Sequence, residues 1–390
     1  MPFHSLAQEL QHLDDAHLRR QRRIVDSAQG AKVIVNGQTL LNFCSNDYLG
    51  LAADGDLASH LADATHKWGV GSGASHLVCG HQAPHEALER ALAAFIGTEA
   101  ALGFGTGYLA NLGVLTALAG REDAIFADKL NHASLNEGAL LSRADFKRFP
   151  HNDLATLERQ LASSMARRKL IAVDGVFSMD GDLAPLPDLL ALAARYDAWL
   201  YVDDAHGFGV LGESGQGSLQ HWGLMQHPER ERLIYMATLG KAAGTAGAFV
   251  AGPQVLVDYL LNRARSYIYT TAAPAALAAA SQLALRKLEE EHWRRQRLQA
   301  HIAALRHGLA TTRYRLANST TAIQPIEVAS AAAALALSAA LQQHGLWVAA
   351  IRPPTVPTPR LRITLSAAHT ADDVAYLIAT LKQLEGMLDS

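Results

Sequence analysis

The central part of the chain alternates between two patterns of apolar residues. Short apolar runs, typical of strands buried on both faces of a sheet, are separated by longer segments in which apolar residues recur every three to four positions, as on one face of a helix. The runs expected to be strands are 100–104, 124–127, 146–149, 170–173, 199–203, 233–237 and 246–251, and the segments expected to be helices are 86–96, 108–119, 134–142, 154–162 and 187–196. This alternation predicts right-handed βαβ crossovers and a mostly parallel sheet.

The two ends of the chain follow other patterns. Regularly spaced leucines within 5–23 predict a surface helix with a basic end, and the Asn36-Gly37 pair predicts a hairpin between strands 33–35 and 39–43. After Pro274 we expect a long helix to about residue 310, then strands at 323–328, 346–351 and 361–365 and helices at 329–344 and 371–387. We therefore expect an N-terminal helix and hairpin over 1–45, a large α/β domain over 46–285 and a smaller α+β domain over 286–390.

Composition narrows the class of protein. A chain of 390 residues with 49% hydrophobic residues can bury a sizeable core, and a formal net charge of −3 argues against a nucleic-acid partner. Only Cys44 and Cys79 occur, without paired spacing, which is typical of a reducing compartment. The first 15 residues lack the pattern of a secretory signal, and no apolar run approaches the ~20 residues needed to span a bilayer. We expect a cytoplasmic protein.

Charged side chains directly follow two of the expected strands. Asp203 ends strand 199–203 and His206 follows it, and Lys241 follows strand 233–237. In open α/β sheets, ligands bind at the carboxyl ends of the strands. A desolvated lysine can form a Schiff base with an aldehyde, and an aspartate opposite a pyridine nitrogen keeps that nitrogen protonated. Taken singly these residues could be exposed surface groups, but together they predict a pyridoxal-phosphate site.

Other motifs leave alternatives. The run Gly105-Thr106-Gly107-Tyr108-Leu109-Ala110 fits the dinucleotide fingerprint G-x-G-x-x-A, which would suit a nicotinamide oxidoreductase, but a helix start binds any phosphate. Gly240-Lys241 lacks the rest of a P-loop pattern, so no nucleotide triphosphate site is indicated. His81 and His85 have the spacing of two metal ligands, but Pro84 lies between them and no third ligand is evident, so we expect no metal site.

Four motifs resemble those of the α-oxoamine synthases, in that family's order. They are Ser45-Asn46-Asp47-Tyr48-Leu49-Gly50, Phe177-Ser178-Met179-Asp180-Gly181-Asp182, Asp203-Asp204-Ala205-His206-Gly207 and Thr238-Leu239-Gly240-Lys241. The likeness extends from about Arg22 to the final helix. It implies an aspartate-aminotransferase-like fold, pyridoxal phosphate, a homodimer with shared active sites, and the condensation of an amino acid with an acyl thioester with release of carbon dioxide.

The run Ile351-Arg352-Pro353-Pro354-Thr355-Val356-Pro357 resembles the biotin-pathway members of the family. This resemblance implies that the substrates are L-alanine and a pimeloyl thioester, carried on CoA or on a carrier protein. Glycine-using relatives, such as the 2-amino-3-oxobutyrate ligases, share the cofactor residues and remain the alternative. The chain departs from the family pattern at Ser75-His76-Leu77 and at Ala242-Ala243-Gly244, which affects acyl selectivity rather than the cofactor.

The resemblance also assigns roles to individual residues. It implies that Lys241, Asp203 and His132 are catalytic, with the imidazole of His132 covering the cofactor ring. The implied cofactor-binding residues are Gly107, Tyr108, Ser178, Asp203, His206, Thr238 and Lys241. Among these, His206 is expected at the phenolic oxygen, and Gly107, Tyr108 and Thr238 at the phosphate. Arg22, His132 and Thr355 are the implied substrate-binding residues.

Overall fold

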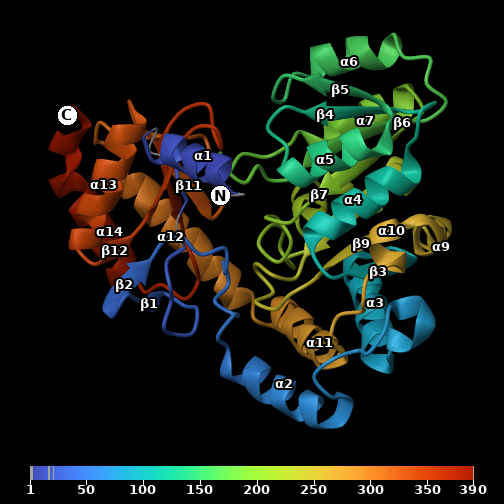
Figure 1. Ribbon diagram of the computed structural model, residues 1–390, viewed down its shortest axis with the longest axis horizontal. Coiled ribbons are helices and arrows are strands. Elements are labelled where there is room, and N and C mark those ends of the chain that lie inside the picture. Colours follow the sequence, from blue (N-terminus) through green and yellow to red (C-terminus); the bar gives the residue numbers. More distant parts are fainter. Residues whose placement is uncertain (1–2, 16–17, 21, 390) are drawn as a thin grey trace.

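The apolar runs of the central chain form the strands of one seven-stranded sheet (Figure 1). The computed structural model describes residues 3–15, 18–20 and 22–389. The strand order is β3-β9-β8-β7-β6-β4-β5, in which β9 is antiparallel to both of its neighbours and the remaining pairs are parallel. The strands are β3 (Ala100–Phe104), β4 (Ala124–Asp128), β5 (Asp145–Phe149), β6 (Lys169–Asp174), β7 (Ala198–Asp203), β8 (Leu233–Thr238) and β9 (Ala248–Gly252). The predicted mostly parallel sheet is therefore confirmed.

Helices bury both faces of this sheet. Along β6, Leu170 and Ala172 belong to one hydrophobic cluster, whereas Ile171 and Val173 belong to the other, as the two-residue period of a strand requires. The first cluster includes residues of α4 (Gly107–Leu118), α5 (Ala133–Ser142) and α9 (Gln254–Arg263), and the second includes residues of α3 (Ala83–Ile96), α6 (Leu154–Ala162) and α7 (Leu186–Arg195). The result is a three-layer α/β/α arrangement.

A smaller antiparallel sheet lies beside the large one. It consists of β10 (Arg315–Leu316), β11 (Ile323–Glu327), β14 (Arg360–Thr364) and β13 (Ala349–Ile351), and the helices of this part are α12 (His292–Leu309), α13 (Ala331–Gln343) and α14 (Ala371–Gln383). The predicted hairpin forms β1 (Lys32–Val35) and β2 (Gln38–Asn42), and β12 (Leu346–Trp347) pairs with β2 in a three-stranded sheet. The hairpin thus joins the C-terminal part of the chain, while the domain limits at 45 and 285 stay predictions.

Three segments differ from the pattern-based expectation. Helix α1 (His4–Asp15) ends well before residue 23; residues 18–20 and 22–23 are not helical, and the other positions of that stretch lie outside the described residues. The long helix expected after Pro274 is two helices, α11 (Ala275–Glu290) and α12, because Glu291 leaves the helical region with φ −93° and ψ 59°. Helix α2 (Gly55–Trp68) was not expected, since only Leu57 and Ala64 on it are buried.

The remaining elements are short. They are α8 (Ser218–His221), α10 (Arg265–Ile268), a π-helical turn η1 (His76–Gly80), and the 3-10 turns η2 (Leu224–Gln226), η3 (Pro228–Arg232) and η4 (Glu385–Asp389). Among the helices of the described residues, none combines the length and apolar character needed to cross a membrane.

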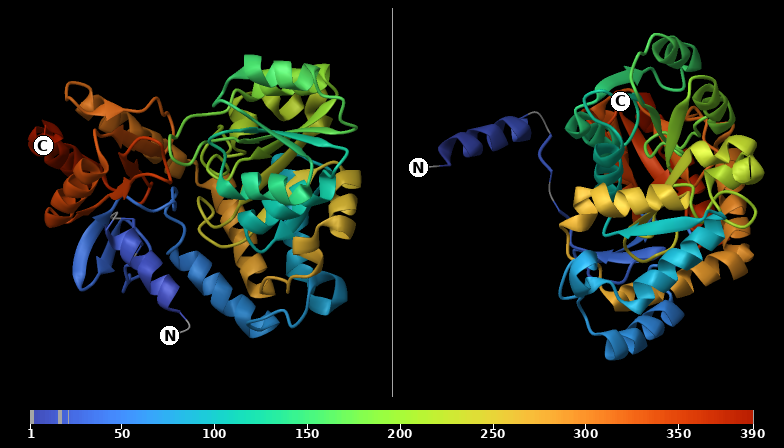
Figure 2. Two further views of the ribbon diagram at one scale, coloured as in Figure 1. Left: turned by 45° about the horizontal axis from the view of Figure 1, so that its top comes forward. Right: turned by 90° about the vertical axis from the view of Figure 1, so that its right-hand side faces the viewer.

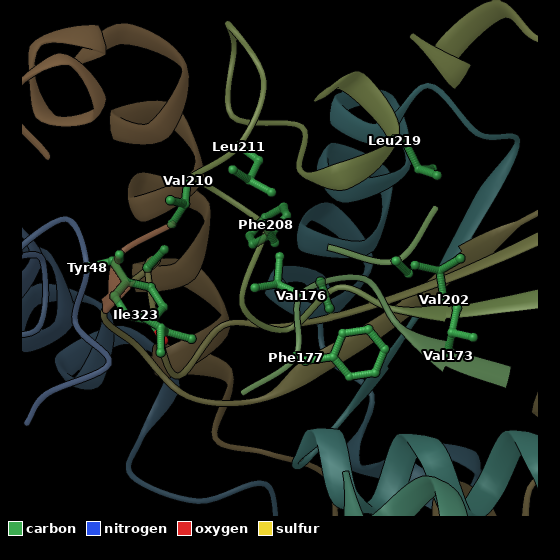
Figure 3. Close-up of a cluster of buried hydrophobic side chains, with 14 of the residues drawn as sticks. Tyr48, Val173, Val176, Phe177, Val202, Phe208, Val210, Leu211, Leu219 and Ile323 are labelled. Atoms are coloured by element: carbon green, nitrogen blue, oxygen red, sulfur yellow. The ribbon is translucent and has the colours of Figure 1, made fainter. Parts of the chain in front are cut away.

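The hydrophobic core is continuous between the two sheets. Phe177 and Phe208 of the large part belong to the same buried cluster as Tyr48 and as Ile323 of β11 (Figure 3). By contrast, α1 projects away from the body of the molecule (Figure 2). Shared burial therefore fixes the small sheet against the loops at one edge of the large sheet, and that edge holds the site described next.

Candidate active site

A cavity of about 170 Å³ opens where β6, β7 and β8 end. Asp174, Asp203 and Thr238 are the last residues of these three strands, so their side chains meet at one edge of the sheet, as the pattern predicted. The cavity is lined by Gly107, Tyr108, Asn111, His132, Ser134, Asp174, Asp203, Ala205, His206, Met236, Thr238 and Lys241. Most of the residues predicted to bind the cofactor therefore come together.

Asp203 is held on the cavity side of β7 by two donors. Asn111 Nδ2 donates to Asp203 Oδ2 at 2.7 Å, and the backbone N–H of Ala205 donates to Oδ1 at 3.0 Å. Asn111 in turn accepts a hydrogen bond from the Tyr201 hydroxyl at 2.7 Å. Our sequence interpretation missed Asn111, although a polar residue within the otherwise apolar stretch 109–115 is a signal that could have found it.

The neighbouring carboxylate of Asp204 occupies a different environment. It accepts hydrogen bonds from the Ser218 N–H at 2.7 Å and from the Tyr235 hydroxyl at 2.8 Å, and it does not line the cavity. A Cβ at Gly217 would lie 1.9 Å from its Oδ2, so the chain needs glycine there. Burial raises the pKa of Asp204 to about 7. The structure therefore separates the two adjacent acids into one at the site and one in the core.

Lys241, His206 and Tyr48 form a chain of side chains that leads from the cavity into the core. Lys241 Nζ lies 2.9 Å from His206 Nε2, and the Tyr48 hydroxyl lies 2.6 Å from His206 Nδ1. Burial lowers the pKa of Lys241 to about 8, and the same burial lowers the pKa of His206 well below its usual value. The lysine amine therefore loses its proton more readily than an exposed lysine does, and it faces a neutral imidazole.

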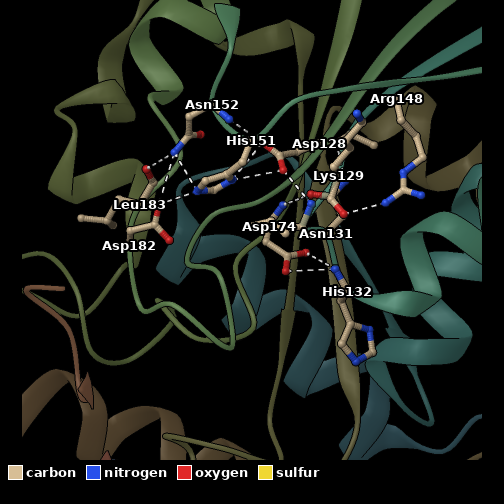
Figure 4. Close-up of polar contacts among 12 residues, drawn as sticks. Asp128, Lys129, Asn131, His132, Arg148, His151, Asn152, Asp174, Asp182 and Leu183 are labelled. Atoms are coloured by element: carbon tan, nitrogen blue, oxygen red, sulfur yellow. Dashed lines mark hydrogen bonds and ion pairs between the residues drawn. The ribbon is translucent and has the colours of Figure 1, made fainter. Parts of the chain in front are cut away.

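His132 begins helix α5 beside Asp174. Its backbone N–H donates to both carboxylate oxygens of Asp174, at 3.1 and 3.2 Å (Figure 4). Its Nδ1 lies 2.7 Å from Ser134 Oγ. Burial lowers the pKa of His132, and burial together with the charge of Asp203 raises the pKa of Asp174. The site thus presents a neutral planar ring on one of its walls.

The start of α4 supplies the part of the cavity suited to an anion. Gly107 and Tyr108 stand in the first turn of this 12-residue helix, where backbone N–H groups have no acceptor within the helix. Thr238 lies next to them in the lining, but its hydroxyl donates to the Gly247 carbonyl at 2.9 Å. Thr238 can therefore accept a hydrogen bond in the cavity more easily than it can donate one.

Ser178 lies outside the cavity lining, and its carbonyl points to an arginine that our sequence interpretation missed. Arg362 Nε donates to the Ser178 carbonyl at 2.7 Å, and Arg362 Nη2 donates to Asn46 Oδ1 at 3.2 Å. Arg362 is 6% exposed, and its charge contributes to the lowered pKa values of His206 and Lys241. An arginine in a buried strand is unusual unless it has a partner, which is the signal that could have found it.

The two residues predicted to line the acyl-substrate site are not brought into this cavity. Arg22 is exposed, and Thr355 is exposed in the loop before β14, where its N–H donates to the Arg352 carbonyl at 3.1 Å. Their assignment stays a prediction.

Three histidines gather outside this cavity. We expected no third ligand near His81 and His85, but His76 joins them, with one potential ligand atom of each ring within 4.8 Å of the others. His85 nevertheless uses both ring nitrogens: Nδ1 accepts from the Gln82 N–H at 3.0 Å, and Nε2 lies 2.7 Å from the Ala273 carbonyl. Both ring nitrogens of His85 are therefore engaged in hydrogen bonds within the protein.

The residues of the cavity match what pyridoxal phosphate requires. A buried amine faces the cavity at Lys241, a carboxylate stands at Asp203, and the N–H groups at the start of α4 suit a phosphate. The chemistry of this donor set fits the cofactor without any change of residue.

Comparison with known proteins agrees with this geometry. The chain matches the family described as aminotransferase class I and II over residues 38–381. It is 58% identical over 370 residues to the 8-amino-7-oxononanoate synthase of Methylobacillus flagellatus, covering 94% of this chain and 92% of that protein. It is 57% identical over 391 residues to the synthase of the same name from Chromobacterium violaceum, covering 100% of this chain and 98% of that protein.

Solved structures support the fold and the cofactor. Serine palmitoyltransferase from S. paucimobilis, solved with bound pyridoxal phosphate, superposes with a TM-score of 0.92 at 29% identity and covers 100% of this chain and 98% of that one. The expected aspartate-aminotransferase-like fold and its cofactor are thereby confirmed. The chain belongs to the aminotransferase class I and II family, and within it to the 8-amino-7-oxononanoate synthases.

Proposed function

We propose that the chain condenses L-alanine with a pimeloyl thioester to give 8-amino-7-oxononanoate, carbon dioxide and the free thiol of CoA or a carrier protein, in biotin biosynthesis. The observation that carries the proposal is the buried Lys241 amine at the carboxyl end of β8, in the same cavity as Asp203. The full-length relatives that bear the synthase name support this choice of substrates. These relatives do not support the glycine-using alternative, and we assign 105–110 to a phosphate site at the start of α4 in place of a nicotinamide site.

Bound pyridoxal phosphate supplies an aldehyde carbon that links to an amine and a ring that accepts electrons from the α-carbon of the amino acid. The chain supplies the proton transfers. Because its pKa is lowered to about 8, a useful fraction of Lys241 is unprotonated near neutral pH, and this amine is still basic enough to remove the α-proton of alanine. Asp203, fixed by Asn111 and Ala205, would hold a proton on the ring nitrogen.

The other cavity residues would orient the cofactor. His206 Nε2 is paired with the Lys241 amine, and it becomes available to the phenolic oxygen when that amine is engaged elsewhere. The neutral ring of His132 is suited to stacking, and the N–H groups of Gly107 and Tyr108 are suited to the phosphate. The Thr238 hydroxyl would donate to the phosphate only by giving up its bond to the Gly247 carbonyl.

Arg362 is our candidate for the carboxylate of alanine. It is a buried cation near Lys241, and its guanidinium is fixed by Ser178 and Asn46, so a planar carboxylate can bind with little loss of side-chain freedom. Ser178 would then act through its carbonyl on Arg362, in addition to the cofactor contact that the family resemblance implies. Arg22 and Thr355 remain candidates for the acyl substrate.

We also propose a homodimer in the cytoplasm. Leu6, Leu10 and Leu13 share one face of α1 and are 51%, 42% and 40% exposed, which is more apolar surface than an isolated helix tolerates without a partner. Segment 263–271, which is polar and aromatic, is our second candidate for a contact with another subunit, and it is mixed: Tyr267 is buried and Tyr269 is 71% exposed. The cytoplasmic location rests on the two free thiols, Cys44 and the exposed Cys79.

The test is a substrate matrix. Alanine, glycine and serine are each combined with several acyl thioesters, including pimeloyl-CoA, and thiol release is measured together with the mass of the product. The proposal expects the highest kcat/KM for alanine with the pimeloyl thioester. A preference for glycine with a short acyl thioester would decide for the alternative.

A further inference from the structure

His151 lies at the centre of a polar network beside the site (Figure 4). It follows β5, and its ring stands edge-on to Phe177 with the ring centroids 4.4 Å apart. Nδ1 lies 3.1 Å from Asp128 Oδ1, and Nε2 lies 2.7 Å from Asp182 Oδ2. An imidazole that donates to a carboxylate from each nitrogen is the protonated form. Burial lowers the pKa of His151, but its bonds to Asp128 and Asp182 outweigh burial and raise the pKa to about 10.

Asp128 connects His151 to the loop that carries His132. Asp128 is the last residue of β4 and is fully buried. Its Oδ1 accepts from the Leu130 N–H at 2.8 Å, and its Oδ2 accepts from the Asn152 N–H at 2.8 Å. The position of the Asp128 carboxylate is therefore fixed by the large sheet and by these backbone N–H groups, and does not depend on His151 alone.

Asp182 connects His151 to the turn 177–182. The Phe177 N–H donates to the Asp182 carbonyl at 3.0 Å, and the Gly181 N–H donates to the Phe177 carbonyl at 2.8 Å, so the turn is closed on itself. A displacement of Asp182 would therefore move the turn as a unit, including the Ser178 carbonyl that accepts the Arg362 Nε–H.

The other side of this turn faces the small sheet. Arg360 donates to the Met179 carbonyl at 3.2 Å and pairs with Asp180, and the Ser319 hydroxyl donates to the Gly181 carbonyl at 2.9 Å. The turn thus lies between the two sheets, and the His151 cation fixes the side that faces the large one.

We propose that His151 is a positioning residue for the amino-acid substrate: as a cation shared by Asp128 and Asp182, it fixes turn 177–182 and with it the carbonyl that orients the Arg362 guanidinium. This inference rests on the proposed function, in which Arg362 binds the carboxylate of alanine. A neutral side chain at position 151 would leave the two carboxylates facing each other without a cation, and the turn would move to separate them.

The test is His151→Gln, with alanine affinity as the readout. Alanine is titrated into the holoenzyme and followed by the change in the visible absorbance of bound pyridoxal phosphate, and KM is measured for both substrates. We expect the alanine Kd and KM to rise about tenfold, the equivalent of one charge-assisted hydrogen bond, with the KM for pimeloyl-CoA within about twofold of the wild type. Arg148→Gln is the matched control, because this exposed cation from β5 donates only to the Lys129 carbonyl among the contacts found for it, and it should leave both constants unchanged.

A double-mutant cycle separates positioning from general stability. In an Arg362→Lys background, His151→Gln should have almost no further effect on alanine affinity, because the contact through which it acts is already altered. An equal tenfold loss in both backgrounds would overturn the proposal, as would an unchanged alanine Kd in the single variant. If His151→Gln folds poorly, Asp182→Asn removes the same ion pair and should weaken alanine binding in the same direction; an unchanged Kd there also contradicts us. If wild-type enzyme binds alanine but releases no thiol from a pimeloyl thioester of either CoA or a carrier protein, the proposed function fails, while the alanine titration still decides the role of His151.

Discussion

Replacing Asp203 by asparagine is expected to slow removal of the α-proton of alanine by about a hundredfold. The substitution removes the negative charge that faces the cavity and keeps the shape of the side chain. Loss of one preorganised electrostatic interaction in an active site costs about 3 kcal/mol of transition-state stabilisation, which is about two decades in rate. The structure adds a local effect, because both Asp203 oxygens accept hydrogen bonds, from Asn111 and from the Ala205 N–H. Asparagine can satisfy only one of these donors unless the Asn111 amide turns.

The assay follows the proton itself. In D₂O, the α-proton signal of L-alanine disappears from the NMR spectrum as the holoenzyme exchanges it, and no acyl thioester is required. A second readout comes from Lys241, since Asp203 is the acid that most raises its pKa against burial. The midpoint of the pH profile should therefore lie at lower pH in the variant than in the wild type.

Asp204→Asn is the matched control. Asp204 is the adjacent acid, is fully buried and accepts hydrogen bonds from Ser218 and Tyr235. Its replacement therefore makes the same chemical change, carboxylate to amide, in the core instead of in the cavity. We expect a lower Tm and an exchange rate within a few-fold of the wild type. If Asp204→Asn slows exchange more than Asp203→Asn does, the wrong acid has been assigned to the ring nitrogen.

Four further outcomes are expected. Lys241→Ala should abolish turnover, and borohydride reduction of the wild-type holoenzyme followed by peptide mapping should place the cofactor on Lys241; label on another lysine would contradict the assignment. Burial lowers the pKa of Lys241 to about 8, so its reactive neutral amine becomes more abundant as the pH rises towards and past 8. Cofactor uptake by the apo-enzyme, followed by visible absorbance, should therefore become faster between pH 7 and pH 9. An uptake rate that does not change with pH would refute this. Arg22→Ala should raise the KM for pimeloyl-CoA and leave alanine binding unchanged; because α1 ends at Asp15, a helix-capping role no longer explains Arg22, and an unchanged KM would remove it from the acyl site. Sedimentation should give a dimer, and a fully active monomer would exclude a shared active site.

Sequence reasoning located the strand ends well because parallel strands leave a simple pattern. Strand β3 has the predicted limits, and β6, β7 and β8 each end within one residue of expectation, so Asp203, His206 and Lys241 could be placed at one edge before their contacts were known. Continuous apolar runs followed by polar residues carry that information locally.

The missed residues depend on contacts that no local pattern records. Arg362 reaches the site from β14 of the other sheet, and its partner Ser178 is 184 positions away in the chain. His76 joins His81 and His85 only because the backbone tightens into a π-helical turn between them. Helix boundaries failed for a different reason: at Glu291 the helical composition continues on both sides, and only the backbone angles show the break.

The choice between the two adjacent acids shows what a strand pattern can decide. Successive residues of a strand point to opposite faces, so Tyr201 and Asp203 share one side of β7 while Val202 and Asp204 share the other. Tyr201 lies in the cluster beneath α4 and α5, where its hydroxyl reaches Asn111, and Val202 lies in the opposite cluster. Once α4 is assigned to the phosphate, the acid on its side of the sheet is Asp203, and Asp204 must find hydrogen bonds in the core, where its Oδ2 accepts from Ser218 and Tyr235. A slip of one residue in the register of β7 would exchange the two acids, so the chemistry of this site depends on the same pairing with β6 and β8 that builds the sheet.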